Sequence, residues 1–135
     1  MANQPRIVVF EDSEADVILL RLTLDTEIGN YEFVQVGDGD EAAALVKSYA
    51  RGAAHADLFV IDLNLPKRSG LEILGDIREH EELRAVPAVV LTSSESPRDR
   101  KAAEELGISA FVRKPIHLAE YLAIGAVLKR CLRDS

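Results

Sequence analysis

The chain has 135 residues, of which 47% are hydrophobic and 29% charged, a balance typical of one globular domain. Its formal net charge of −7 argues against a nucleic-acid-binding surface. The single cysteine, Cys131, allows no internal disulfide, and no apolar run is long enough to span a membrane. We therefore expect a cytoplasmic protein without nucleic-acid or membrane partners, folded as a single domain over residues 1–135.

Short apolar runs alternate with segments of helical periodicity along the chain. The first run, Arg6–Phe10, is rich in β-branched residues and continuously apolar after Arg6, as in a parallel strand that is covered on both faces. Five such strands are predicted: Arg6–Phe10, Tyr31–Val36, Asp57–Ile61, Pro87–Leu91 and Ala110–Val112. The alternation predicts an α/β fold of the (βα)5 type, a doubly wound five-stranded parallel sheet with helices on both faces.

Each predicted strand is followed by a segment predicted to be helical. Ser13, Ser69 and Ser96 stand where side chains cap the first, third and fourth helices, and the second helix is predicted from about Asp40 to Arg51. The apolar face of the first helix is predicted to contain Ala15, Ile18, Leu19 and Leu22. The last segment is predicted as one helix whose apolar face contains Leu118, Tyr121, Leu122, Gly125 and Leu128.

The helix that begins at Pro97 has an almost wholly polar sequence. Only Ala102, Ala103 and Leu106 can pack against the sheet, so we expect this helix to be weakly docked. A weakly docked helix beside a reactive site is a natural moving part. The alternative is a solvated helix without a role, and the sequence alone leaves both interpretations open.

Polar residues directly follow four of the predicted strands. Glu11 and Asp12 follow the first strand, Asp62 the third, Thr92 the fourth, and Lys114 comes shortly after the fifth. Because the carboxyl ends of parallel strands meet at one edge, where ligands bind, we expect these side chains to converge. Clustered carboxylates repel one another and need a cation, while a hydroxyl and an ammonium suit a phosphoryl group.

The segments VVFEDSEAD, LFVIDLNLPKRSG, VVLTSS and AFVRKP resemble the receiver domain of two-component response regulators. They occur in the family's order, each at a strand end, and the resemblance extends over residues 6–128. It implies a flavodoxin-like receiver fold. The motifs EDSEAD, DLNLP and LTSS resemble those of stand-alone regulators that pair with phytochrome-type histidine kinases. Because few residues follow the last predicted helix, we expect no output domain.

The resemblance also implies a role for each residue of the set. Asp62 is implied as the phosphoacceptor, since a carboxylate can attack the phosphorus of a phosphohistidine and form an acyl phosphate. Glu11 and Asp12 are implied to hold Mg²⁺, with Asp62 and the Asn64 backbone carbonyl as further oxygen ligands. Glu11 stands where Asp is commoner, and its extra methylene favours contact with a metal-bound water rather than with the metal itself. The remaining roles are the switch hydroxyl Thr92, the switch aromatic Phe111 and the conserved lysine Lys114.

The expected function is a phosphorylation-dependent response regulator that signals by protein–protein interaction. Its expected partners are a sensor histidine kinase and a downstream protein, with a homodimer through the helix 4–strand 5–helix 5 face. The resemblance further favours a cis Lys114–Pro115 bond. One alternative is a phosphatase or phosphotransferase of the haloacid-dehalogenase type, but Asn64 stands where that chemistry needs a second aspartate. Another is a degenerate interaction module, against which the intact residue set argues. We expect no enzymatic activity beyond self-catalysed phosphorylation and dephosphorylation.

Overall fold

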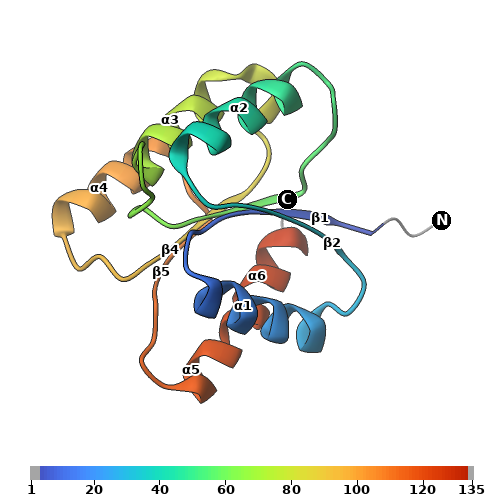
Figure 1. Cartoon of the computed structure of the whole chain (residues 1–135), viewed down its shortest axis with the longest axis vertical. Helices are drawn as coiled ribbons and strands as arrows, with labels where there is room; N and C mark the ends of the chain where they lie inside the picture. The colour runs from blue at the N-terminus through green and yellow to red at the C-terminus, as the bar shows by residue number, and fades with distance from the viewer. Residues whose placement is uncertain (1–3, 134–135) are drawn as a thin grey trace.

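The fold is one parallel sheet covered by helices on both faces (Figure 1). The computed structural model describes residues 4–133, and its strands lie in the order β2-β1-β3-β4-β5 with every neighbouring pair parallel. The strands are β1 Arg6–Phe10, β2 Glu32–Val36, β3 Leu58–Ile61, β4 Ala88–Thr92 and β5 Ala110–Arg113. The predicted doubly wound (βα)5 sheet is therefore confirmed. The strand order reverses between β1 and β3, which is where such folds bind ligands.

Helices α2, α3 and α4 cover one face of the sheet, and α1, α5 and α6 cover the other (Figure 1). Their bounds are α1 Glu14–Glu27, α2 Gly39–Ala50, α3 Gly70–Glu79, α4 Pro97–Leu106, α5 Leu118–Leu122 and α6 Ile124–Arg133, with a short 3₁₀ helix at Glu81–Leu83. None of the helices in residues 4–133 is long and apolar enough to cross a membrane.

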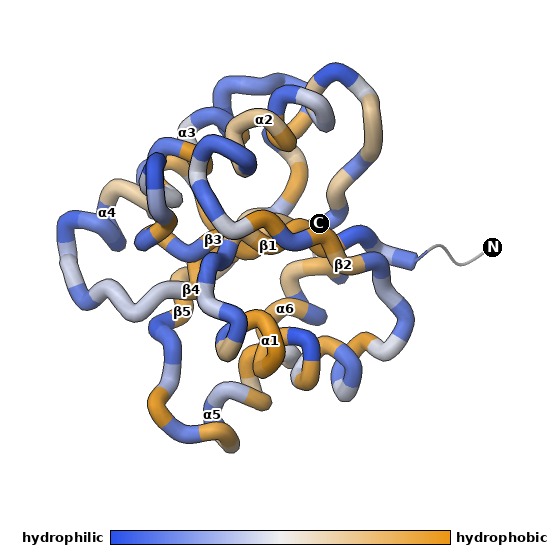
Figure 2. The backbone as a smooth tube through the Cα atoms, viewed as in Figure 1, coloured by the Kyte–Doolittle hydropathy of each residue, from blue (hydrophilic) through white to orange (hydrophobic). Residues whose placement is uncertain are grey.

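The central strands separate two hydrophobic cores. Val8 and Phe10 of β1 point into the core under α2, α3 and α4, whereas Ile7 and Val9 point into the core under α1, α5 and α6. Both faces of β1, β3 and β4 are covered, so these central strands are almost continuously apolar, and Figure 2 shows the strands as a mainly hydrophobic layer. Burial on both faces is the reason why the sequence predicts these strands so well.

The predicted helix starts are confirmed by their caps. The hydroxyl oxygens of Ser13, Ser69 and Ser96 each accept a hydrogen bond, at 3.3 Å, from the backbone N–H three residues on. Helix α4 ends at Leu106 and is capped by Gly107, whose positive φ of 95° suits glycine. Ala103 is the one buried residue of α4, in agreement with its polar sequence.

The prediction of one continuous C-terminal helix is wrong, because a side chain from α1 interrupts it. The hydroxyl of Thr23 donates to the Leu122 carbonyl oxygen at 2.5 Å and accepts from the Gly125 N–H at 3.0 Å. Those two backbone groups would otherwise belong to the helical hydrogen-bond ladder. A Cβ on Gly125 would lie 2.4 Å from the Thr23 hydroxyl oxygen, so glycine is needed for this approach. The helix therefore divides into α5 and α6.

The predicted apolar face of α1 is also partly wrong. Ile18 and Leu22 are 66% and 46% exposed, whereas Leu20, Thr23 and Leu24 are buried. The inward face of α1 is the one that carries Leu20 and Leu24 in the core and Thr23 against the α5–α6 junction, so Ile18 and Leu22 lie in solvent. On α5, the predicted core residues Leu118 and Leu122 are likewise exposed.

Replacing Thr23 with valine is expected to destabilise the fold by about 1–3 kcal/mol, because the Leu122 carbonyl and the Gly125 N–H lose their buried partner. Chemical denaturation followed by circular dichroism measures the change. Thr26→Val is the matched control on the same helix, since that exposed hydroxyl bonds only to the Leu22 carbonyl one turn earlier. An equal loss in both variants would show that the junction contact does not contribute specifically.

Candidate functional site

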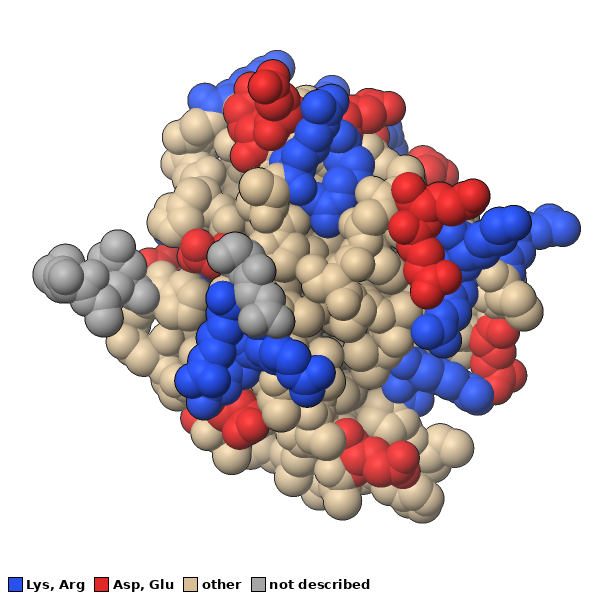
Figure 3. Space-filling view, turned by 180° about the vertical axis from the view of Figure 1, so that it is seen from behind, with Lys and Arg blue, Asp and Glu red and all other residues tan. Residues whose placement is uncertain are grey.

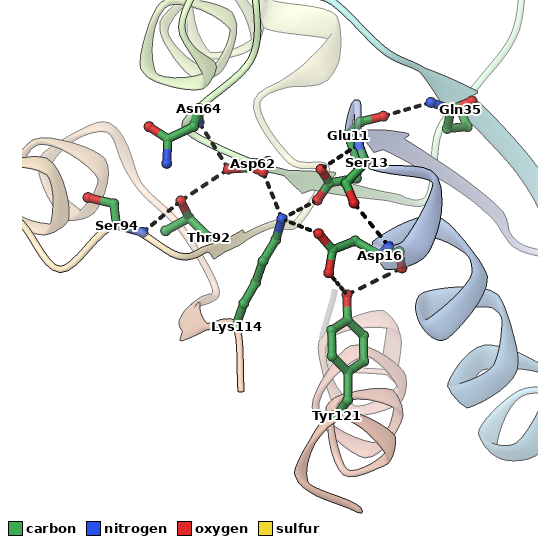
Figure 4. Close-up of polar contacts among 10 residues, drawn as sticks. All are labelled: Glu11, Ser13, Asp16, Gln35, Asp62, Asn64, Thr92, Ser94, Lys114 and Tyr121. Atoms are coloured by element: carbon green, nitrogen blue, oxygen red, sulfur yellow. Dashed lines mark hydrogen bonds and ion pairs between the residues drawn. The ribbon is translucent and has the colours of Figure 1, made fainter. Parts of the chain in front are cut away.

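The five residues predicted to converge meet at the carboxyl edge of the sheet. Figure 4 shows four of them, Glu11, Asp62, Thr92 and Lys114. Strand pairing brings them there, because the Asp62 N–H donates to the Phe10 carbonyl at 3.0 Å and the Lys114 N–H donates to the Thr92 carbonyl at 2.8 Å. The prediction that Glu11, Asp12, Asp62, Thr92 and Lys114 form one site at this edge therefore agrees with the geometry.

Glycine at the start of α3 brings that helix close to Asp62. The Gly70 N–H donates to the Leu63 carbonyl at 2.9 Å, and a Cβ on Gly70 would lie 2.2 Å from the Asp62 carbonyl oxygen. The loop between them folds back so that the Asn64 N–H donates to Asp62 Oδ1 at 2.9 Å. This backbone bond fixes one carboxylate oxygen of Asp62.

The ammonium group of Lys114 binds three carboxylates. Its Nζ lies 2.7 Å from Glu11 Oε1, 2.9 Å from Asp16 Oδ2 and 2.9 Å from Asp62 Oδ2. Burial alone would lower the pKa of Lys114, but the hydrogen bonds to the three carboxylates outweigh it and raise the pKa. Lys114 therefore stays charged and neutralises part of the acidic cluster.

Glu11 is a buried carboxylate at the end of β1. Burial, with the nearby charge of Asp62, raises the pKa of Glu11 to about 7, against the opposing effect of Lys114 and of the Ser13 N–H, which donates to Glu11 Oε2 at 3.1 Å. A raised pKa means that the negative charge of Glu11 is costly without a further cation.

Glu11, Asp12 and Asp62 can each offer one carboxylate oxygen to a common ion. These oxygens lie within 4.8 Å of one another, close to the span of two Mg²⁺–oxygen bonds of about 2.1 Å each. Asp12 is exposed while Glu11 and Asp62 are buried, so the cluster has a floor and a solvent-facing side. A hard cation that keeps several water ligands fits this set of donors.

Thr92 connects Asp62 to the start of α4. Its buried hydroxyl donates to Asp62 Oδ1 at 3.1 Å and accepts from the Ser94 N–H at 3.2 Å. The Ser94 hydroxyl in turn donates to Asp99 Oδ2 at 2.9 Å, in the first turn of α4. A change at Asp62 can therefore reach α4 through consecutive hydrogen bonds.

Phe111 lies on β5, outside this hydrogen-bonded cluster. Its half-buried ring packs against the core under α4, and the guanidinium carbon of Arg100 lies 5.3 Å from the ring centroid. A cavity of about 320 Å³ beside it is lined by residues of the β4–α4 loop, of α4 and of β5. The ring therefore has space beside it.

The family model described as the response regulator receiver domain matches residues 7–124. The chain belongs to this family. It is 32% identical over 122 residues to the response regulator Rcp1 of Synechocystis sp., covering 88% of this chain and 83% of that protein. The chain is thus a phosphorylation-dependent response regulator of two-component signalling. The comparisons do not support the phosphatase alternative.

Solved receiver structures share the whole fold. The phosphorylated cyanobacterial phytochrome response regulator RcpA matches with a TM-score of 0.89 and 29% identity, over 98% of this chain and 97% of that one. The receiver domain of the sensor histidine kinase PA1611 from Pseudomonas aeruginosa, which has magnesium in its active-site cleft, matches with a TM-score of 0.76 and 27% identity, over 97% and 99%. The acidic cluster of Glu11, Asp12 and Asp62 described above is likewise a group that could hold a metal ion, in agreement with the expected Mg²⁺ cofactor.

Two residues of the receiver site were not predicted from the sequence. Asp16 of α1 binds Lys114, and the Tyr121 hydroxyl of α5 lies 3.4 Å from Asp16 Oδ1. The capping pattern from Ser13 to Asp16 explains the helix start but gives no signal for a role of this carboxylate. The expected cis Lys114–Pro115 bond is wrong, since the bond is trans and Lys114 reaches its three partners in that form.

Asp12→Ala is expected to abolish or greatly weaken Mg²⁺ binding while leaving the metal-free fold as stable or slightly more stable, because one repelling charge is removed. The chain contains no tryptophan, so isothermal titration calorimetry is the suitable measurement. Glu14→Ala, which removes an exposed acid outside the cluster, is the control. Unchanged Mg²⁺ affinity in Asp12→Ala would exclude Asp12 as a ligand.

Proposed function

We propose that Asp62 accepts the phosphoryl group in this receiver domain and that Thr92 and Lys114 assist the transfer. The supporting observation is that Asp62 accepts hydrogen bonds from both the Thr92 hydroxyl and the Lys114 ammonium while its carboxylate belongs to the acidic cluster. A hydroxyl donor and an ammonium donor are thus already placed beside the carboxylate to which the phosphoryl oxygens would be added.

The chemistry is a displacement at phosphorus. A carboxylate oxygen of Asp62 forms the new O–P bond as the P–N bond of the kinase phosphohistidine breaks, and the imidazole nitrogen leaves with the electron pair. Lys114 and Thr92 place positive charge and a hydroxyl proton at the phosphoryl oxygens. When bound, Mg²⁺ neutralises further charge on those oxygens. We propose Asp12, Asp62 and the Asn64 carbonyl as ligands, with Glu11 either a direct ligand or bound through a water.

The switch in this proposal runs from Thr92 to α4. A phosphoryl oxygen draws the Thr92 hydroxyl away from Asp62, and the hydrogen bond from the Ser94 N–H changes with it. Phe111 can then rotate into the space vacated behind Thr92, and α4, with Ala103 as its one buried residue, shifts. A free-energy bias of a few kcal/mol, about 5.5 for a complete reversal, would move this equilibrium.

The partner proposed for the phosphorylation step is a sensor histidine kinase of the phytochrome type, in line with the similarity to Rcp1 and RcpA. Ile116 and Leu118, which are 93% and 54% exposed, follow Lys114, and Ile18 is 66% exposed on α1. Ile116 and Leu118 lie close in sequence to Lys114, and Ile18 lies on α1 with Asp16. These exposed apolar side chains suit contact with an apolar surface of a partner helix. The net charge of −7 supports a protein partner over a nucleic acid, and on the rear face drawn in Figure 3 acidic side chains lie among the basic ones.

After phosphorylation, we propose that the shifted α4 changes the surface offered to a downstream protein. The α4–β5–α5 face is also the surface we propose for a homodimer. We infer a cytoplasmic location, since histidine kinases use ATP. We also infer that the chain does not turn over free phosphate esters, since Asn64, two residues after Asp62, offers neither an acid nor a base.

With Mg²⁺ and acetyl phosphate, the chain is expected to gain one phosphoryl group that hydroxylamine releases, as an acyl phosphate requires. Asp62→Asn is expected to abolish this label, which mass spectrometry of the intact protein measures. Asp76→Asn, a half-buried acid of α3 outside the cluster, should label as the wild type does. Stable labelling of Asp62→Asn would refute the assignment.

Thr92→Ala is expected to accept phosphate still, but to lose the coupling between Asp62 and α4. The measurement is amide NMR over residues 92–114 with and without Mg²⁺ and beryllofluoride, a mimic of the phosphoryl group. The wild type should show shifts through α4 that the variant lacks. If both proteins show the same shifts, another surface carries the signal.

A further inference from the structure

Asp16 is a charged residue at the site to which the proposed phosphoryl transfer assigns no role. It lies in the first turn of α1, with its side chain 24% exposed, and Figure 4 shows its carboxylate between Lys114 and Tyr121. The distance of 2.9 Å from Asp16 Oδ2 to Lys114 Nζ equals that from Asp62 Oδ2 to the same nitrogen. Asp16 is therefore as close a partner of the lysine as the proposed phosphoacceptor.

Helix capping does not explain where the Asp16 carboxylate points. In a capping box, the carboxylate three residues after the cap reaches back to the N–H of the capping residue. Here the Ser13 N–H donates to Glu11 Oε2 at 3.1 Å instead. Only the backbone N–H of Asp16 takes part in the cap, bonding to the Ser13 hydroxyl. The carboxylate is thus left to bind Lys114.

Tyr121 holds this carboxylate in place. Its hydroxyl lies 3.4 Å from Asp16 Oδ1 and 3.3 Å from the Asp16 backbone oxygen, and the side chain is buried. Burial and the negative charge of Asp16 raise the pKa of Tyr121, so the phenol keeps its proton and can donate. Asp16 is therefore oriented from α5 as well as from its own helix.

The acceptors of Lys114 differ in what happens to them during phosphorylation. An ammonium has three N–H donors, and here they face Glu11, Asp16 and Asp62. Glu11 and Asp62 belong to the acidic cluster that a Mg²⁺ ion would engage, and Asp62 would also carry the phosphoryl group. Asp16 lies outside that cluster, so it can keep its contact with the lysine throughout.

We propose that Asp16, oriented by Tyr121, is a positioning residue for phosphoryl transfer, which holds the Lys114 ammonium beside Asp62 while Mg²⁺ and the phosphoryl group occupy the other two acceptors. This inference rests on the proposed phosphorylation of Asp62. It adds a path by which α1 and α5, the helices proposed to lie near the kinase, affect the chemistry.

The test is the rate at which acetyl phosphate labels the full chain over a range of Mg²⁺ concentrations. Asp16→Asn is expected to lower the maximal rate roughly 10- to 100-fold, because a loosened lysine is misplaced at the transition state. The Mg²⁺ concentration for half-maximal rate should stay unchanged, since Asp16 is not a proposed ligand. Asp16→Glu, which keeps the charge, should restore part of the rate.

Tyr121→Phe should lower the maximal rate less than Asp16→Asn does, and the double variant should be no slower than Asp16→Asn alone, because the tyrosine acts through the aspartate. Asp25→Asn and Tyr31→Phe form the matched control pair. The Tyr31 hydroxyl donates at 2.5 Å to Asp25, which lies on α1 as Asp16 does. These control variants therefore remove an equivalent carboxylate charge and tyrosine hydroxyl at a place that does not contact Lys114.

A wild-type rate in Asp16→Asn, or an equal loss in Asp25→Asn, would overturn the positioning role. So would losses from Asp16→Asn and Tyr121→Phe that simply multiply in the double variant. Absence of labelling in the wild type would instead refute the proposed function, so the two failures are distinguishable.

Discussion

One ammonium group offsets part of the negative charge at the carboxyl edge of the sheet. The Nζ of Lys114 lies within 2.9 Å of carboxylate oxygens of Glu11, which follows β1, of Asp16 on α1, and of Asp62, which follows β3. Without it, acids that are largely shielded from water would repel one another at short range, and the raised pKa of Glu11 shows how costly their charge already is. The sheet can therefore keep an acidic pocket open to Mg²⁺ and still be folded when no metal is bound.

The sequence predicts the strands and the site residues that end them because both depend on local patterns. Strands buried on two faces are continuously apolar, and strand ends in a parallel sheet share an edge, so Asp62 and Lys114 could be brought together before any coordinates were known. Asp16 could not be predicted in this way. Its role depends on where α1 lies relative to β5, and its position three residues after Ser13 already had an explanation as part of a cap.

The two errors in helix prediction have one tertiary cause. Periodicity correctly indicates that 118–133 is helical, but it cannot reveal that the hydroxyl of Thr23, about a hundred positions earlier, takes two backbone partners there. On α1, the face that carries Thr23 points to the α5–α6 junction, so Ile18 faces solvent. By contrast, the weak packing of α4 could be predicted, since its sequence has few apolar residues. The hydrogen-bonded link from α4 to Asp62 through Thr92 and Ser94 could be found only in the structure.

The free energy of unfolding of Lys114→Met, with and without Mg²⁺, tests most directly whether the ammonium holds this edge together. Methionine retains an apolar stem but removes the charge. The account predicts that the metal-free variant is less stable than the wild type by about 3–5 kcal/mol, because a buried charge cluster loses its counter-ion. Saturating Mg²⁺ should then stabilise the variant more than it stabilises the wild type. A metal-free variant as stable as the wild type would contradict the account.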